Sequence, residues 1–467
     1  MTQLHQPTPS RLRLNLKTGP RQVRPRTSAA RPTIAEADAA PQPGPPPAAA
    51  PEVRARILRE IRPAAPSPGT PPPAAVPDRV AIVHDWCPSY RGGERVAAEL
   101  CRTFGSSEFY TLFDFLDAGL KAQCFPGVTF HTSAANRLPM VARYYRALFF
   151  ACPFLVEQFD VTGHDAVVSS SAAFARGVLT RPDQPHLCYV HSPVRYAWDE
   201  QFNYLAQGRL GLGPKGLLFR YMLHRLRSWD VRTAHGPDLM VANSGFIRAR
   251  IRRVYGRDAL VVHPPVDLDA FRLEADKDDY YVTASFLAPY KRTDLVIEAF
   301  NRMPGRRLVV VGDGQQSARL RFLAGPNVSF TGYLDDARYV AAVSRARALV
   351  FAGCEDFGIA LAEAQAAGTP LVAFGRGGAC DIVCDLGGWD APTGVLFPRQ
   401  SADAIIAAVE RFEAGAAAIT PAACRHNAQR FSTGRFRREM LAALDLAREL
   451  NAGPASRFTA GGRLALS

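Results

Sequence analysis

The chain has 467 residues, of which 47% are hydrophobic and 21% are charged. This length allows two or three domains with sizeable cores, and the composition is that of a globular protein. No run of 18 apolar residues occurs, and the chain begins without the apolar core of a secretory signal, so we expect neither a membrane span nor export. The nine cysteines lack metal-ligand spacing, so we expect reduced thiols in a cytoplasmic protein.

The formal net charge is +13. Residues 1–77 hold 11 Lys and Arg against 4 Asp and Glu, so this segment carries +7 of the total. A basic balance suits nucleic acid, an anionic membrane surface or an anionic substrate. No nucleic-acid motif occurs, and the basic residues are not interleaved with a platform on which bases could stack, so we do not expect a nucleic-acid partner.

Residues 1–77 are rich in Pro, Ala and Arg. Such a segment cannot bury enough apolar surface to offset the entropy lost on ordering, so we expect it to be disordered. It serves either as a solubilising tail or as a tether, and the sequence leaves both interpretations open.

The first ordered element that we expect is a buried strand at Arg79–Trp86, which ends in His84 and Asp85. A loop follows, and a helix then begins near Gly92 and Gly93. A strand that leads through glycines into a helix presents backbone N–H groups to an anion. The alternative is that the glycines serve only a tight turn. The spacing is not G-x-G-x-x-G, so a dinucleotide site is not predicted.

Two stretches, Arg137–Phe159 and Pro214–Ala234, combine arginines with aromatic residues, and we expect both to be helical. Basic amphipathic helices can lie on an anionic membrane surface. Their apolar faces can equally complete the domain core while the arginines are solvated, and the sequence does not decide between these interpretations.

Between these stretches, the strand LCYVH is expected to end at His191. Ligands of open α/β sheets lie beyond the carboxyl ends of the strands, so we expect His191 to face a ligand. Further along, His263 is followed by two prolines, which end regular structure, and we place the hinge between two domains there.

The second half repeats the alternation of strands and helices. We expect a strand at Tyr280–Pro289 and a helix that opens at Lys291. The adjacent Asp335 and Asp336 lie at a helix start, which is typical of a helix cap rather than a metal site. We therefore expect no metal.

The most informative stretch runs from Cys354 to Asp381. Glu355 lies in a turn after an apolar strand, Gly358 precedes a helix, and Glu363 lies inside that helix. Helix N–H groups and the helix dipole favour an anion, and glycine allows its close approach. The two carboxylates can accept hydrogen bonds from hydroxyls on either side of that anion. A sugar nucleotide offers sugar hydroxyls, a diphosphate and ribose hydroxyls in this order.

The E-x7-E pattern with Phe-Gly inside it, followed by AxxxGTPLVA, resembles the C-terminal half of family-4 retaining glycosyltransferases. The resemblance implies an α/β protein of the GT-B fold, with two doubly wound Rossmann-like domains that face a cleft. It places an acceptor-side domain at 78–262 and a nucleotide-sugar-binding domain at 263–433. At 434–467 it places a helix that crosses back to the first domain and then a frayed tail.

The stretch YVHSPVRYAWD resembles bacterial mannosyltransferases of surface polysaccharide assembly. It implies GDP-mannose as the donor and a lipid-linked or oligosaccharide acceptor, although UDP-glucose remains open. The resemblance implies that the protein is cytoplasmic and acts at the inner face of the plasma membrane. Two alternative functions also remain open: the protein could be a sugar-nucleotide 2-epimerase of similar fold or a non-catalytic sugar-nucleotide-binding protein.

The resemblance also assigns roles to residues. Glu355 would bind hydroxyls of the donor sugar, Glu363 those of the ribose, and Lys291 the diphosphate. We expect catalysis to depend on Glu355, His191 and Lys291, and donor binding to depend on Glu363, Gly358, Ile359, Gly92, Gly93, Tyr333, Leu334 and Arg292.

One position departs from the family pattern. Relatives commonly carry an arginine five residues before the lysine, and this chain has Phe286 there. One cation of the diphosphate site is therefore missing. Arg292, Arg376 and Arg95 are the candidates to replace it.

Overall fold

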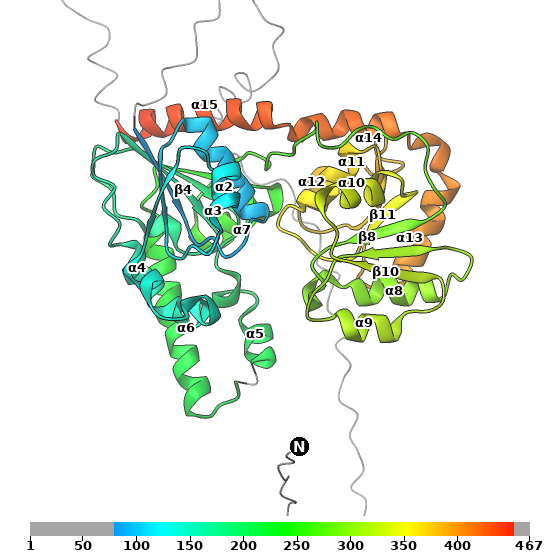
Figure 1. The fold of residues 1–467 in the computed structure, drawn as a ribbon, viewed down its shortest axis with the longest axis horizontal. Helices are drawn as coiled ribbons and strands as arrows, with labels where there is room; N and C mark the ends of the chain where they lie inside the picture. Colours follow the sequence, from blue (N-terminus) through cyan, green and yellow to red (C-terminus); the bar gives the residue numbers. More distant parts are fainter. Residues whose placement is uncertain (1–78, 209, 453–467) are drawn as a thin grey trace, which may run out of the picture. The chain divides into compact units, whose positions relative to one another are not determined.

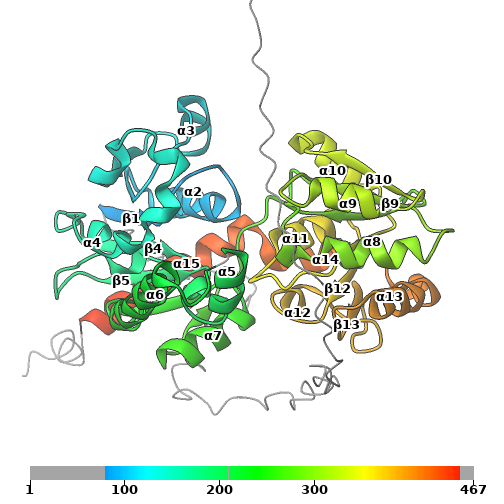
Figure 2. The same cartoon turned by 90° about the horizontal axis from the view of Figure 1, so that it is seen from below.

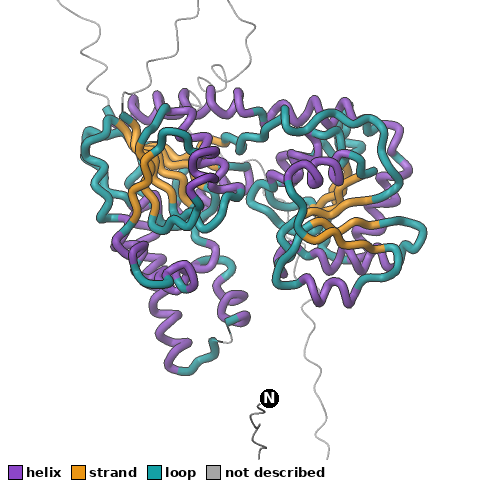
Figure 3. Tube along the Cα trace, in the orientation of Figure 1, coloured by secondary structure: helices purple, strands orange, loops and turns teal. Residues whose placement is uncertain are grey.

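The computed structural model describes residues 79–208 and 210–452 (Figure 1). The expected disorder of residues 1–77 and the expected fraying beyond residue 453 therefore lie outside the described residues. Within the described part, two parallel β-sheets alternate with helices along the chain, and Figure 3 shows the strands of each sheet enclosed by helices.

The first sheet has seven parallel strands in the order β3-β2-β1-β4-β5-β6-β7. The chain runs outward from β1 to β3 and then returns to the other side of β1, so the direction reverses between β1 and β4. The strands are β1 Val80–His84, β2 Glu108–Thr111, β3 Thr129–Thr132, β4 Ala166–Ser171, β5 His186–Val190, β6 Leu239–Ala242 and β7 Leu260–Val261.

The second sheet has six parallel strands in the order β10-β9-β8-β11-β12-β13, and its direction reverses between β8 and β11. Because ligands of doubly wound sheets bind where the direction reverses, each sheet has one such position. The strands are β8 Tyr281–Ala284, β9 Leu308–Val311, β10 Val328–Gly332, β11 Ala348–Phe351, β12 Leu371–Phe374 and β13 Gly394–Phe397.

The central strands are short apolar runs that are buried on both faces. Every residue of β1 (VAIVH), β11 (ALVF) and β12 (LVAF) is buried. Parallel strands of this kind require helices on both sides of the sheet. The first sheet has α2 Gly92–Phe104, α3 Ala118–Cys124, α4 Cys152–Val156, α5 Gln201–Gln207, α6 Pro214–Thr233 and α7 Gly245–Tyr255.

The helices that follow belong mainly to the second sheet (Figure 2). They are α8 Thr293–Asn301, α9 Ser317–Leu323, α10 Asp336–Ser344, α11 Ile359–Ala366, α12 Ala379–Ile382, α13 Ala402–Ala414, α14 Pro421–Ala428 and α15 Thr433–Asn451. The predicted capping role of Asp335 is confirmed, because its side chain accepts a hydrogen bond from the Arg338 backbone N–H at the start of α10.

The last helix, α15, packs on the first sheet although it follows the second sheet in sequence. Phe436, Met440 and Leu444 are buried in the same core as strands β1 and β5. The Tyr189 and Phe436 rings lie 5.8 Å apart. The apolar face of α15 is thus buried against the sheet at the other end of the chain.

Two local expectations are wrong. The stretch 137–159 is not one helix: it forms short 3-10 turns at Val141–Arg143 and Tyr145–Phe150, followed by the five-residue α4. Prolines 139 and 153 interrupt a continuous helix, and Met140 has a left-handed φ of 53°. Likewise, Lys291 ends a 3-10 turn, and α8 begins only at Thr293, after Arg292 has adopted a φ of 53°.

The second basic stretch does form a long helix, as expected, over α6. Within the part of the chain that the structure describes, no helix combines the length and the apolar content needed to span a bilayer. All nine cysteines are free thiols in the structure.

A charged network is buried beneath the first sheet. Arg176 and Asp230 form an ion pair with both side chains fully buried. The Trp198 indole N–H donates to Asp230 at 2.7 Å, and the Tyr255 hydroxyl donates to the same carboxylate at 3.1 Å. Through these contacts the Asp230 carboxylate of α6 connects three other elements: the turn at Ala175–Gly177, the turn at Arg195–Ala197 and helix α7.

Candidate functional site

The reversal point of the second sheet brings together Lys291 and Glu355. Lys291 follows β8 and Glu355 follows β11, and these two strands pair directly. The Lys291 ammonium forms an ion pair with the Glu355 carboxylate, and the side chains are 15% and 21% exposed. Burial opposes the charge of Lys291, but the neighbouring Glu355 more than compensates and raises the pKa of Lys291. The lysine is therefore cationic at neutral pH.

The N-terminus of α11 lies beside this pair. Gly358 precedes the helix with a φ of 94°, a conformation that favours glycine, and no side chain caps the helix. The first N–H groups of an α-helix have no partner within the helix, and they attract anions. A β-carbon on Gly92 of the first sheet's α2 would lie 3.0 Å from Ile359 Cδ1, so a bulkier residue there would press on this helix start.

Glu363, one turn further along α11, is buried, and each of its carboxylate oxygens accepts one hydrogen bond. Arg95 of α2 donates to its Oε1 at 2.9 Å, and the Tyr339 hydroxyl donates to its Oε2 at 3.0 Å. Burial raises the pKa of Glu363, although Arg95 and Tyr339 oppose the shift. Each carboxylate oxygen has a second lone pair, so the group can still accept bonds from two neighbouring hydroxyls.

The reversal point of the first sheet is filled by the protein itself. Asp85 follows β1, and its carboxylate accepts four backbone hydrogen bonds of 2.6 to 2.8 Å, from the N–H groups of Ala172, Ala173, Phe174 and Ala175. This amide cluster would otherwise suit a phosphate. Because a carboxylate already occupies it, the second sheet offers the better place for a diphosphate.

His191 lies at the carboxyl end of β5, as expected. Its Nε2 is 2.8 Å from Ser170 Oγ, and the same hydroxyl lies 3.1 Å from His84 Nδ1. Burial, with a smaller contribution from His84, lowers the pKa of His191 to about 3. The imidazole is therefore neutral near pH 7: one ring nitrogen donates a hydrogen bond and the other accepts one, but the ring is not an imidazolium that could act as a general acid.

Several contacts connect residues that follow β6 in the chain to residues just before α11 and to α12. The Gly245 N–H, at the start of α7, donates to the Asp381 carboxylate at 2.6 Å. The Ser244 hydroxyl donates to the Asp356 carbonyl oxygen. His263 stacks on Phe357, with ring centroids 5.4 Å apart.

His263, which takes part in these contacts, makes the stability of the folded protein depend on pH. Burial, together with the positive charges of Arg435 and Arg430, lowers the pKa of His263 to about 4, while its bond to the Asn243 carbonyl opposes the shift. Asp381 lies 3.9 Å away. The unfolded chain takes up this proton near pH 6.5, whereas the folded protein does so only near pH 4, so acidification through this window favours unfolding.

We expect His263→Gln to remove up to roughly 3 kcal/mol of the acid-induced loss of stability between pH 6.5 and 4. Denaturant unfolding at several pH values measures this. His426→Gln, at an exposed histidine of α14, is the matched control and should leave the slope unchanged. An identical slope in wild type and His263→Gln would contradict the assignment.

The remaining expected site residues are placed as follows. Gly93 lies beside His84, because a β-carbon there would be 3.8 Å from His84 Cε1. Arg292 donates to Asp294 at 3.2 Å. Tyr333 is 83% exposed after β10, and Leu334 packs against the core that includes α11.

Sequence reasoning did not find the partners of Glu363. Tyr339 carries no motif, and Arg95 was considered only as a replacement cation. Arg376, another such candidate, is exposed after β12. Among residues 79–208 and 210–452, no group of three or more His, Cys, Asp or Glu side chains is placed to hold a metal ion.

The fold is similar to that of several solved structures. Anabaena HepE, in complex with UDP and glucose, matches 78% of this chain and 99% of its own, with a TM-score of 0.57 and 16% identity. Sucrose-phosphate synthase from Thermosynechococcus elongatus matches 82% of this chain and 100% of its own, with a TM-score of 0.55 and 19% identity. At these identities the likeness concerns the fold alone. It confirms the predicted α/β GT-B class.

Two family models cover most of the described chain. The model described as "Glycosyltransferase Family 4" matches residues 90–270, and the model described as "Glycosyl transferases group 1" matches residues 267–431. The chain belongs to the GT-B glycosyltransferases of family 4.

Curated relatives include a D-inositol 3-phosphate glycosyltransferase from Mycolicibacterium paratuberculosis, 32% identical over 36% of this chain and 43% of its own length. A GDP-mannose-dependent alpha-(1-6)-phosphatidylinositol monomannoside mannosyltransferase from Mycobacterium tuberculosis is 31% identical over 40% of this chain and 56% of its own length. The chain thus spans about half the length of these relatives.

Proposed function

We propose that this protein transfers a hexose from a nucleotide sugar, with retention of anomeric configuration, and that GDP-mannose is the donor. The observation that carries the proposal is the Lys291–Glu355 ion pair beside the uncapped start of α11, at the reversal point of the second sheet. This arrangement supplies a fixed cation and helix N–H groups for a diphosphate, with a carboxylate on each side for hydroxyls. Relatives named as GDP-mannose-dependent support the choice of donor.

Charge development explains why such a site would accelerate transfer. As the glycosidic bond to the diphosphate breaks, negative charge builds on the leaving phosphate oxygens. Lys291 and the N–H groups at Gly358 and Ile359 would stabilise this charge without reorganisation. The acceptor hydroxyl attacks from the side on which the phosphate leaves, a new carbon–oxygen bond forms, and the hydroxyl proton passes to the leaving phosphate.

Glu355 would position the sugar rather than attack it. Its carboxylate is already paired with Lys291, and its free lone pairs can accept bonds from sugar hydroxyls. Glu363 would hold the ribose. The neutral His191 would exchange a hydrogen bond with the transferred sugar, and the backbone at Tyr333 and Leu334 would meet the base. The acceptor would be a lipid-linked or free oligosaccharide.

The donor is tested by incubating the protein with GDP-mannose or UDP-glucose, an oligosaccharide acceptor and EDTA. We expect transfer from GDP-mannose that persists in EDTA. Transfer from UDP-glucose alone would change the donor, and loss of transfer in EDTA would contradict the metal-free site. Epimerisation without an acceptor would instead support a sugar-nucleotide 2-epimerase, and binding without turnover a non-catalytic protein.

Glu363→Gln tests the ribose contact. The amide keeps the shape of the side chain, but its nitrogen cannot accept a hydrogen bond, so one oxygen must serve Arg95, Tyr339 and the ribose. We expect the donor KM to rise about tenfold to a hundredfold, since hydrogen bonds to charged groups contribute more than neutral ones. Steady-state kinetics measure the change, and Glu410→Gln on the exposed face of α13 is the control. An unchanged KM would remove Glu363 from the donor site.

We further propose that the surface formed by α5 and α6 contacts an anionic lipid bilayer. Large apolar side chains are exposed there: Phe202 is 72% exposed, Leu212 77%, Leu217 54%, Leu218 60% and Tyr221 60%. Exposed Lys215 and Arg225 lie on α6 among them. Apolar residues interleaved with cations match an anionic headgroup layer over hydrocarbon.

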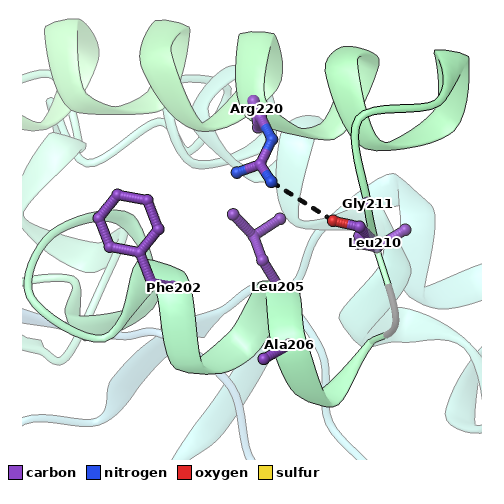
Figure 4. Close-up of a pocket in the computed structure, with 6 residues that line it drawn as sticks. All are labelled: Phe202, Leu205, Ala206, Leu210, Gly211 and Arg220. Atoms are coloured by element: carbon purple, nitrogen blue, oxygen red, sulfur yellow. Dashed lines mark hydrogen bonds between the residues drawn. The ribbon is translucent and has the colours of Figure 1, made fainter. Parts of the chain in front are cut away.

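A cavity of about 420 Å³ lies between α5 and α6 (Figure 4). It is lined by Phe202, Leu205, Ala206, Leu210, Gly211 and Arg220. Arg220 extends from α6 over the apolar side chains of α5 and donates to the Leu210 carbonyl at 3.4 Å. An apolar groove with a cation at its edge suits the chain and phosphate of a lipid-linked acceptor.

Replacing Leu217 and Leu218 together by glutamate should weaken this contact. Two exposed leucines would no longer be buried in lipid, and two negative charges would repel anionic headgroups. We expect binding to phosphatidylglycerol vesicles to fall about tenfold or more in cosedimentation. Phe322→Glu on α9, at a side chain that is 89% exposed, is the control. Equal cosedimentation of the double variant and wild type would reject this surface.

A further inference from the structure

Arg91, which the sequence did not single out, lies over the one position that departs from the family pattern. Its guanidinium carbon is 5.0 Å from the centroid of the Phe286 ring. Arg91 immediately precedes α2, whereas Phe286 follows β8 in the second sheet. Phe286 is 45% exposed, and the Arg91 side chain is exposed as well. The two side chains therefore meet at the solvent-accessible edge of the site.

The backbone at Arg91 is held firmly. Its N–H donates to the Glu94 carboxylate at 3.0 Å, so the glutamate that follows Gly92 and Gly93 caps α2. The next residue, Gly92, approaches Ile359 at the start of α11. One turn further along α2, Arg95 is bound to Glu363. The first turn of α2 thus presents two guanidinium groups to the edge of the proposed donor site.

These two arginines are engaged very differently. Arg95 forms an ion pair with a buried carboxylate, and that contact already satisfies its charge. Among the described residues, Arg91 forms no ion pair and rests instead on an aromatic ring. A cation–π contact between exposed side chains is weak compared with a charge-assisted hydrogen bond to a phosphate. Arg91 is therefore the cation that can change partners at little cost.

We propose that Arg91 is the second cation of the diphosphate site and that it stacks on the ring of Phe286 when no ligand is bound. When a nucleotide sugar binds, the guanidinium leaves the ring and forms paired hydrogen bonds to phosphate oxygens opposite Lys291. Arg91, which precedes α2 on the first sheet, thus supplies the positive charge that Phe286 lacks. This inference rests on the proposed function, because it assumes that a diphosphate occupies this site.

The other candidate cations are less suited to this role. Arg292 is bound to Asp294 at 3.2 Å, and Arg95 is bound to Glu363. Arg376 is exposed after β12, on the far side of β11 from β8. Arg91, by contrast, has its guanidinium over the ring of Phe286, the residue at the position where relatives carry the arginine.

The test compares the binding of GDP and guanosine by calorimetry in EDTA. We expect Arg91→Met to weaken GDP binding about tenfold to a hundredfold and to leave guanosine binding unchanged, because only GDP carries the phosphates. Arg253→Met, at an exposed arginine of α7, should leave both affinities unchanged. Thermal melting of each variant establishes that it is folded.

A rescue experiment separates a binding role from a structural one. Adding Phe286→Arg to the Arg91→Met variant places a cation on the β8 side, and we expect it to restore most of the GDP affinity. Unchanged GDP affinity in Arg91→Met, with affinity lost in Lys291→Met, would overturn the role of Arg91 and leave the proposed function intact. Unchanged affinity in both variants would contradict the proposed function itself.

Discussion

Lys291→Met should lower kcat about 10²- to 10³-fold, the range found when a preorganised group that stabilises transition-state charge is removed. Methionine keeps much of the volume of the side chain but loses the charge. The leaving diphosphate would then lose its fixed cation and keep the N–H groups of α11 and the proposed contact with Arg91, and Glu355 would lose its partner. Initial rates at saturating donor and acceptor give the value.

Lys121→Met is the matched control for this variant, because Lys121 is also ion-paired but lies on α3, where its partner is Asp114 in the loop after β2. We expect its kcat to equal that of wild type. A kcat within experimental error of wild type for Lys291→Met would show that the lysine does not stabilise the leaving group.

Asp230→Ala should destabilise the fold by about 3–5 kcal/mol, the cost of leaving a buried charge without its partner. Arg176 is fully buried and would lose its carboxylate. The Trp198 indole and the Tyr255 hydroxyl would lose their acceptor at the same time. The free energy of unfolding in urea measures the loss.

Replacing both partners, with Arg176→Met and Asp230→Leu, should recover much of this stability, because no charge then remains buried. Asp278→Ala breaks the exposed ion pair with Arg345 and should cause little change. If Asp230→Ala were as stable as Asp278→Ala, the buried network would not be what holds these elements together.

The sequence predicts the fold well because both sheets are built from short apolar strands that alternate with helices. Strands such as β1 and β12 are buried on both faces, and their runs of Val, Leu, Ile and Ala indicate this directly. The stretch 137–159 does not form the expected continuous helix, because Pro139 and Pro153 interrupt it. Proline fixes the local backbone whatever the surrounding pattern.

The candidate site is predictable only where its residues are neighbours in the sequence. Glu355, Gly358 and Glu363 lie within nine residues of one another and share one turn and one helix. The contact of Glu363 with Arg95 joins positions 268 residues apart, and no local pattern signals it. Phe286 is recognisable from the sequence as a departure, but Arg91, which lies over it, precedes α2 and is 195 residues away in the sequence, so no local pattern signals the contact.

The central claim is that a nucleotide diphosphate binds, without a metal ion, between Lys291 and the start of α11. A crystal structure of the protein with GDP in EDTA tests it most directly. We expect β-phosphate oxygens within about 3 Å of Lys291 Nζ and of the Ile359 backbone nitrogen, with Glu363 on the ribose. A diphosphate bound elsewhere, or Glu355 and Glu363 both turned away from the ligand, would contradict the account.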